Sequence, residues 1–345
     1  MTPTRWLVSV LSFALAFGVS AMIVARTVPT TGLPSLGASV HLVLLTIALV
    51  ELCCRAGKIH LSGRALRVHI PFGTAMRTVL GGDFAAAITP ARSGAEPARF
   101  LVLAEARVPL AERLIVLFLE LFLELWSLLA VCLTLALAFR GTSSSMRGLL
   151  GLVGGYATFV LSVGAVGFAL SRRAVGAPPP GWLARLGVQG ARWERLSHFL
   201  HEWGHAVRGL RHAHVPTLAV SLLASVVHIV LRVATLPVLI ALADPGFAWT
   251  RETLAPLVLW PLALFYGSVV VPAPSGGGAV EGAFTYVLRD AIPAALFASA
   301  LLWWRFYTYY LYMLLGGLAA GRTVMRALRP AAPRPSAMSS AVSTT

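Results

Sequence analysis

Long apolar runs determine what this chain can fold into. A helix needs about 20 apolar residues to cross the hydrocarbon core of a bilayer, because each residue adds only about 1.5 Å. The chain is 57% hydrophobic and 12% charged, which is far from the balance of a soluble domain. The sequence therefore predicts an all-α polytopic membrane protein with about six spanning helices. The predicted spans are residues 6–25, 36–54, 114–139, 148–171, 217–243 and 294–320.

Two further apolar segments, residues 78–107 and 254–290, are interrupted by proline and glycine. The first interruption begins at Thr89-Pro90 and the second at Val271-Pro272, and each continues through small residues and glycine to glutamate and phenylalanine. Open backbone at membrane depth is tolerated only where it is buried in protein or lines a cavity. Paired interruptions in two halves of a chain point to a transporter's binding site. We therefore predict two re-entrant broken-helix segments.

The distribution of basic residues predicts the orientation. The chain has 28 Lys and Arg against 13 Asp and Glu, a net charge of +15. No soluble basic domain is present to bind nucleic acid, so we assign this charge to the membrane surface. With both termini in the cytoplasm, 21 basic residues fall inside and 5 outside. The two broken segments then enter from opposite sides as an inverted repeat, unless residues 254–271 span the bilayer by themselves.

Residues 1–329 are expected to form one membrane domain, followed by a disordered tail at 330–345. Two basic stretches, residues 55–77 and 172–215, are predicted to be cytoplasmic, and the second has the pattern of an amphipathic helix on the membrane surface.

The broken segments carry side chains suited to a lipid headgroup. Arg92 and Arg99 are candidates for bidentate binding of phosphate oxygens, and a glycine-rich turn lets backbone N–H groups approach an anion. Asp83, Glu96 and Glu281 are candidates to bind a cationic group, to carry protons or to pair with arginine. The candidate substrate-binding residues are Asp83, Arg92, Gly94, Glu96, Arg99, Pro274, Ser275, Gly276, Gly277, Gly278, Glu281 and Arg305.

Charged side chains also occur inside predicted spans, as Glu120 with Glu124 and as His228 with Arg232. Each pair is spaced i, i+4 and so shares a helix face. A charge at the bilayer centre costs roughly 2.5–3.5 kcal/mol on insertion scales, so these groups need partners or water. Two interpretations stay open: an intramembrane relay, or structural ion pairs such as Glu120 or Glu124 with Arg232 or Arg305.

One metal motif is present. His201-Glu202-x-x-His205 fits the H-E-x-x-H pattern of zinc proteases, but position 211, where the extended motif has its third histidine, is Arg211. The histidines of this helix are better explained as its polar face, so a membrane zinc protease is a remote alternative and we expect no metal or cofactor.

The broken segments resemble a known family. The pattern Thr89-Pro90-x-Arg92-x-Gly94-x-Glu96-x-x-Arg99, after Gly82-Asp83-Phe84, and the pattern Pro272-x-Pro274-x-Gly276-Gly277-x-x-x-Glu281 resemble two signatures of the lysylphosphatidylglycerol synthase transmembrane region, also called flippase-like domain proteins. Arg305, an aromatic run and Gly316-Gly317 resemble its closing helix. Ser275 and Ala95 depart from it, each standing where the family often has glycine.

This resemblance implies a helical domain of the bacterial inner membrane that moves lipids between leaflets, without the soluble synthase domain of bifunctional members. The expected ligand is an anionic or aminoacylated phospholipid, or a polyprenyl-phosphate-type lipid. The alternative is a non-transporting protein that binds a lipid and scaffolds a lipid-modifying or glycosyl-transferring enzyme. No complete catalytic motif is found, so we expect no enzyme activity.

Overall fold

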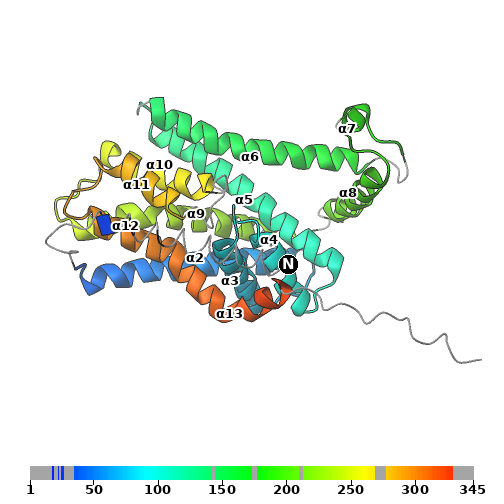
Figure 1. Cartoon of the computed structure of the whole chain (residues 1–345), viewed down its shortest axis with the longest axis horizontal. Coiled ribbons are helices and arrows are strands. Elements are labelled where there is room, and N and C mark those ends of the chain that lie inside the picture. The colour runs from blue at the N-terminus through cyan, green and yellow to red at the C-terminus, as the bar shows by residue number, and fades with distance from the viewer. Residues whose placement is uncertain are drawn as a thin grey trace, which may run out of the picture.

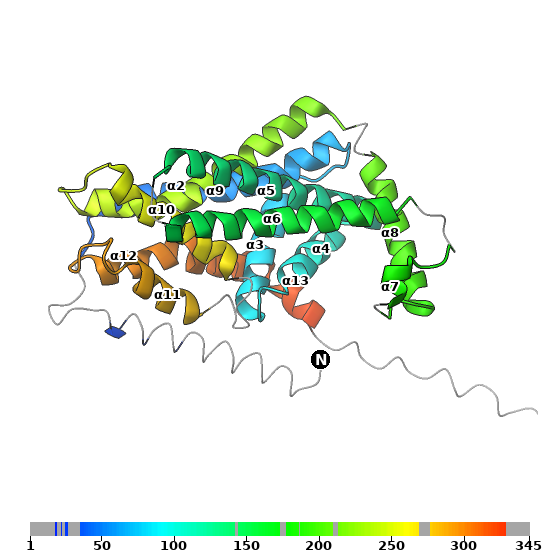
Figure 2. The ribbon, with the colours of Figure 1, turned by 90° about the horizontal axis from the view of Figure 1, so that it is seen from above.

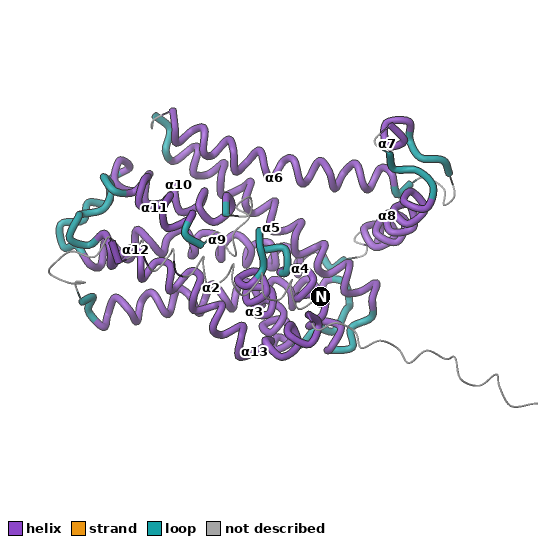
Figure 3. Tube along the Cα trace, in the orientation of Figure 1, coloured by secondary structure: helices purple, strands orange, loops and turns teal. Residues whose placement is uncertain are grey.

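The computed structural model describes residues 18, 22, 25–26, 35–141, 144–172, 177–185, 187–209, 213–268 and 277–328. Every regular element in this part of the chain is a helix, as Figures 1 and 3 show. The prediction of an all-α membrane protein is confirmed. Most of the predicted span 6–25, the tail 330–345 and the centre of the second interruption, residues 269–276, lie outside the described residues.

Four described helices are long and apolar enough to cross a bilayer. They are α2 (Ala38–Ala65), α5 (Leu110–Ala138), α6 (Ser144–Leu170) and α9 (Val215–Ala243). Each corresponds to one predicted span, and the total of six stays a prediction.

The last predicted span, 294–320, is helical but not uniform. It consists of α12 (Phe297–Arg305), a π-helical turn η2 (Phe306–Tyr310) and α13 (Leu311–Leu328), which follow one another without a break. Single π-helical turns inside α-helices are frequent at functional sites.

Helix α2 is longer than the sequence indicated. The predicted span ended at residue 54 and residues 55–77 were assigned to a cytoplasmic segment, but α2 continues to Ala65 and the next helix begins at Phe72. The helix continues because Arg55 and Lys58 are buried in ion pairs with other helices, so their charge does not end it. The cytoplasmic placement of residues 55–77 stays a prediction.

The first broken segment is a pair of helices, α3 (Phe72–Ile88) and α4 (Ala95–Glu105), that pack against each other. The turn between them is held by Thr89, whose hydroxyl accepts the N–H of Gly94 at 2.9 Å and donates to the carbonyl of Ala85 at 2.7 Å. The first broken segment begins at Phe72, six residues earlier than the predicted residue 78.

The second broken segment also contains two helices in contact, α10 (Arg251–Gly267) and α11 (Ala279–Leu288). α10 has 17 residues, which is the lower end of the roughly 17–25 residues that a spanning helix needs. That this segment re-enters instead of spanning stays a prediction. In both views, α10, α11 and α12 lie toward one end of the molecule, and α3 and α4 lie further along its long axis (Figures 1 and 2).

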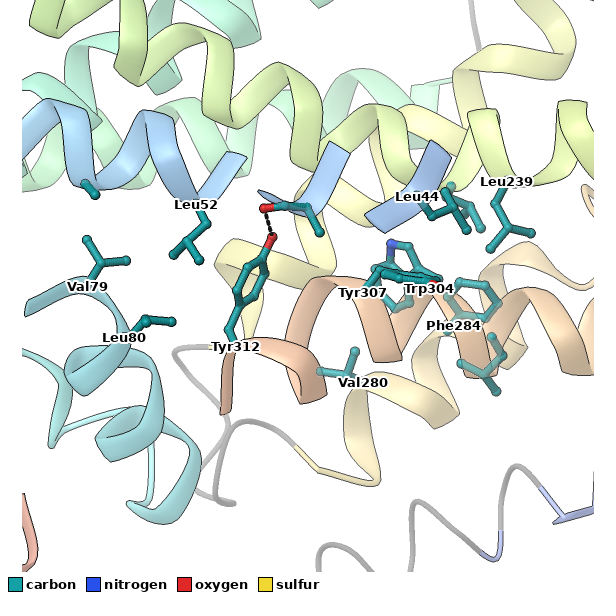
Figure 4. Packing of buried hydrophobic residues seen from close by; sticks show 14 of the residues in the cluster. Leu44, Leu52, Val79, Leu80, Leu239, Val280, Phe284, Trp304, Tyr307 and Tyr312 are labelled. Carbon is teal, nitrogen blue, oxygen red and sulfur yellow. Dashed lines mark hydrogen bonds between the residues drawn. The ribbon is translucent and has the colours of Figure 1, made fainter. Parts of the chain in front are cut away.

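Side chains from α2, α3, α9, α11, α12 and α13 form the main apolar core (Figure 4). Trp304 and Phe284 are fully buried at its centre, with ring centroids 5.0 Å apart. The Tyr312 hydroxyl donates to the carbonyl of Ala48 at 3.1 Å and so ties α13 to α2 (Figure 4). This core holds the ends of both broken segments in place.

Helices α7 (Gly181–Arg185) and α8 (Ala191–Gly209) lie within the segment predicted to be amphipathic. The indole N–H of Trp193 donates to the carbonyl of Ala177 at 2.7 Å, and α8 packs against α5 and α6. Trp193 and Leu200 are buried while Phe199 is exposed. Placement of this segment on the membrane surface stays a prediction.

Candidate functional site

A small polar cavity lies where the two broken segments meet. It has a volume of about 30 Å³, which is room for about two water molecules. Its walls come from the end of α3 and the following turn, the end of α10, the middle of α9 and the junction of α12, η2 and α13. The lining residues are Asp83, Ala86, Arg92, Arg232, Leu264, Phe265, Ser268, Arg305, Thr308, Tyr309 and Tyr312.

The cavity brings together four residues that the sequence singled out, namely Asp83, Arg92, Arg232 and Arg305. Three are arginines and one is a carboxylate, so the lining itself is positively charged. Arg232 came from the set of charges inside predicted spans, whereas Asp83 and Arg92 came from the first broken segment. The two sets of sequence signals therefore describe one site.

Asp83 is held by an arginine that the sequence analysis missed. The guanidinium of Arg55 donates to both carboxylate oxygens of Asp83, each at 2.7 Å. Both side chains are almost completely buried, with 7% and 11% of their surface exposed. This bidentate geometry is the strongest form of an arginine–carboxylate pair, so the charge of Asp83 is already neutralised.

Arg232 and Arg305 also have carboxylate partners. The Arg232 Nη2 lies 2.7 Å from Oε1 of Glu51, and the Arg305 Nε lies 2.6 Å from Oε1 of Glu281. Each guanidinium nevertheless keeps a buried N–H group, on Nε of Arg232 and Nη2 of Arg305, without a hydrogen-bond partner among the described residues. A buried donor left unpaired costs about 1–3 kcal/mol, which makes these groups suited to an incoming acceptor.

Arg92 differs from the other cavity arginines. It has a left-handed backbone, with φ of 56°, in the turn between α3 and α4. Within the described part of the chain, no carboxylate oxygen lies within 4 Å of its guanidinium. A non-glycine residue in this conformation is uncommon and occurs at functional sites.

Glu281 is a structural residue. Its Oε2 accepts the N–H of Gly278 at 2.9 Å, which closes the turn before α11, while its Oε1 binds Arg305. Gly278 has φ of 79°, a value that favours glycine. Of the predicted glycine-rich turn, Gly277 and Gly278 are described, and Pro274, Ser275 and Gly276 lie outside the described residues. Of the three roles predicted for Glu281, the structure shows the pairing with an arginine.

A second group of ion pairs extends from the site along α2, α4, α5 and α9. Lys58 Nζ lies 2.9 Å from Glu120 and also binds Glu124. Arg99 bridges Glu120 at 2.8 Å and the half-exposed Glu96 at 3.1 Å. Glu124 also accepts from the Tyr266 hydroxyl at 3.1 Å and lies 3.3 Å from Nε2 of His228.

The expected pairs of Glu120 or Glu124 with Arg232 or Arg305 are wrong. The reason is α2, which packs against both α5 and α9 and presents its own charges to them. Glu51, Arg55 and Lys58 are spaced i, i+4 and i+7, so they share one face of α2. This spacing was the signal available in the sequence, and it was lost when the helix was ended at residue 54.

Two glycines of the family pattern, Gly82 of the first signature and Gly316 of the closing helix, make room for neighbouring groups. At Gly82 a Cβ would lie 2.7 Å from Nε of Arg99, so the absence of a side chain makes room for that arginine. On α13, a Cβ at Gly316 would collide with the carbonyl oxygen of Leu80 and lie 2.9 Å from Cβ of Phe84. Both glycines allow α3 to approach its neighbours closely.

The histidine motif is only partly visible. His201 lies on α8, while the side chains of Glu202 and His205 lie outside the described residues. Among the residues that are described, no three His, Cys, Asp or Glu side chains are arranged to hold a metal ion.

Comparison with protein families finds a match over most of the chain. The family described as lysylphosphatidylglycerol synthase TM region matches residues 9–316, which is most of the chain. The matched range includes both broken segments, the cavity and the ion pairs along α2, α5 and α9. A search of curated proteins finds no relative that matches this chain.

Proposed function

Because the chain belongs to the lysylphosphatidylglycerol synthase transmembrane region family, a membrane domain of flippase-like proteins, we propose that it carries lipid headgroups between leaflets. The phosphate of the headgroup enters the cavity where the two broken segments meet, and the acyl or prenyl tails stay in the bilayer. This role needs binding and movement but no covalent chemistry.

The observation that carries the proposal is the set of three arginines around one cavity. Arginine donors match phosphate geometry, and two of these guanidiniums keep buried N–H groups without partners among the described residues. Helix ends from both broken segments reach the same place, as in transporters whose sites form from discontinuous helices.

The cavity must open during transport. A volume of about 30 Å³ admits water but not a phosphate headgroup. We propose that α3–α4 and α10–α11 act as re-entrant elements from opposite sides of the membrane, with both termini in the cytoplasm, and that each in turn moves away from the cavity. The orientation rests on the charge bias. That bias falls from 21 against 5 to 17 against 5 once Arg55, Lys58, Arg92 and Arg99 are counted as buried.

Transport can be measured in proteoliposomes that contain a trace of acyl-labelled lipid, by the fraction of label that a membrane-impermeant quencher reaches. We would test phosphatidylglycerol, phosphatidylcholine and lysylphosphatidylglycerol, since all three carry a phosphate. At least one of them should cross faster than in protein-free vesicles. Arg92→Gln should slow that lipid at least about tenfold, since a charged hydrogen bond contributes about 1.5–3 kcal/mol.

Arg107→Gln is the matched control, because Arg107 is also an arginine with a left-handed backbone, with φ of 60°, but is exposed at the end of α4. Transport equal to protein-free vesicles for all three lipids would refute the proposal. If a lipid bound without crossing, the protein would instead be a lipid-binding scaffold for another enzyme.

A further inference from the structure

We infer that the cavity selects a headgroup with a net negative charge and rejects one with a net positive charge, including an aminoacylated headgroup. This inference rests on the proposed function and narrows its substrate class. It departs from the lipid in the family's name, and it follows from how the charges of this chain are already paired.

The carboxylates near the cavity all lie beside cationic side chains of the protein. The chain has 13 Asp and Glu residues, and those buried among the helices are Glu51, Asp83, Glu120, Glu124 and Glu281. Each lies within 4 Å of a lysine, arginine or histidine nitrogen, and Asp83 and Glu281 have two donors apiece. The two oxygens of Glu51 accept no hydrogen bond from the described residues. Glu51 is nevertheless 1% exposed, does not line the cavity and lies 2.7 Å from Arg232, so an ammonium group would have to share it with that arginine. At the other four carboxylates an ammonium group would have to displace an existing partner.

The charges in and directly behind the lining leave an excess of one positive charge. The arginines are Arg55, Arg92, Arg232 and Arg305, and the carboxylates are Glu51, Asp83 and Glu281. Arg92 is the member without a carboxylate within 4 Å among the described residues. A phosphate diester with an uncharged substituent would neutralise this excess, whereas a lysyl ester would add to it.

The undescribed residues that follow Ser268 in the sequence carry no charge that would alter this balance. Residues 269–276 follow Ser268 directly, and their sequence contains no charged side chain. The undescribed stretches of the chain, 1–17 and 329–345 included, contain no Asp or Glu. Glu202 on α8 is the one acidic residue whose side chain is not described, and α8 contributes no residue to the cavity lining.

The aromatic side chains of the lining already bind cations. Arg305 lies over the ring of Tyr309 at 4.7 Å, and Arg232 lies over Phe265 at 5.5 Å and Tyr312 at 5.8 Å. An ammonium group gains most from an aromatic ring when it faces the ring within about 6 Å. Here an arginine covers one face of each ring, so the rings stabilise the positive lining instead of offering a cation site.

The effect of one unit charge is large in such a place. At a separation of about 6 Å and an effective dielectric constant of about 20, it changes binding by roughly 100-fold. Screening by entering water reduces this, so we expect at least about a tenfold preference for the anionic lipid.

The test compares initial transport rates of phosphatidylglycerol and lysylphosphatidylglycerol at equal concentration, with the full-length protein in proteoliposomes. We expect phosphatidylglycerol to move at least about tenfold faster. Arg92→Glu should reverse or abolish this ratio, because it puts a free carboxylate into the cavity. Arg107→Glu, with the same charge change on the exposed surface, should leave the ratio unchanged.

Equal or faster movement of lysylphosphatidylglycerol in the unmodified protein would overturn the inference while leaving lipid transport intact. If Arg92→Glu does not fold, Arg92→Gln must bring the ratio close to one, and an unchanged ratio would overturn the inference. If neither lipid moves, the proposed transport function fails. The inference is then decided by which of the two lipids the purified protein binds.

Discussion

Single residues divide into structural and ligand-binding roles according to their partners. Arg55, Lys58 and Glu281 make two strong contacts each inside the protein, so their charges hold helices together. Arg92 has no carboxylate within 4 Å in the described part of the chain. Removing a paired residue should therefore damage the fold, whereas removing Arg92 should damage function.

Arg55→Met tests the structural role. It leaves Asp83 buried without its bidentate partner, and breaking a buried pair in this way costs about 3–5 kcal/mol. We expect this loss in the free energy of unfolding, measured by denaturant titration in detergent micelles. The double variant Arg55→Met with Asp83→Leu should recover most of the loss, because neither member of this pair is then left buried without the other.

Arg77→Met is the control for this measurement, because Arg77 pairs with Glu105 at 3.2 Å on the surface, where both side chains are more than 40% exposed. Exposed pairs contribute about 0–1 kcal/mol. If Arg55→Met were no more costly than Arg77→Met, the buried network would not stabilise the fold.

The sequence singled out some of the residues that line the cavity and did not single out others, for a definable reason. Asp83, Arg92 and Arg305 line one cavity. They could be recognised in the sequence because Asp83 and Arg92 lie close to a helix break and Arg305 is a charged residue within an apolar segment. Arg55 and Lys58 were not singled out because basic residues after an apolar run look like the end of a span, and without them Glu51 had no visible partner on its helix face. Which carboxylate binds which cation depends on helix packing, which spacing along one helix does not specify.

At the level of elements, close contact between α3 and α13 fixes one wall of the site. Gly316 of α13 lies against the backbone of Leu80, and Gly317 faces the ring of Phe84. Small residues of this kind let membrane helices approach closely. The sequence identified this glycine pair. It did not show that a side chain would fit at Gly317 and would collide at Gly316.

Gly316→Ala should therefore be far more damaging than Gly317→Ala. A Cβ at 316 would collide with the Leu80 carbonyl oxygen and lie 2.9 Å from Phe84 Cβ, whereas at 317 the nearest atom would be a Phe84 ring carbon at 3.4 Å. Overpacking typically costs about 1–3 kcal/mol. We expect that loss for Gly316→Ala and less than about 0.5 kcal/mol for Gly317→Ala in the same unfolding titration, and equal effects would contradict this packing.

For the whole molecule, the sequence predicted the helical membrane class and the two broken segments. It did not predict the length of α2 or the π-helical turn after Arg305, because both depend on contacts between distant parts of the chain. One cavity is lined by Asp83 and Arg92 from the first broken segment, by the end of α10 from the second, and by Arg305. The two interruptions therefore contribute to a single site. The central claim is that this site binds an anionic lipid headgroup.

Native mass spectrometry of the purified protein with its co-purified lipids tests this claim most directly. We predict a bound lipid with one net negative charge on a phosphate diester, retained in Arg107→Gln and reduced at least about tenfold in Arg92→Gln. Equal occupancy in the two variants, or a predominance of aminoacylated lipid in the unmodified protein, would contradict it.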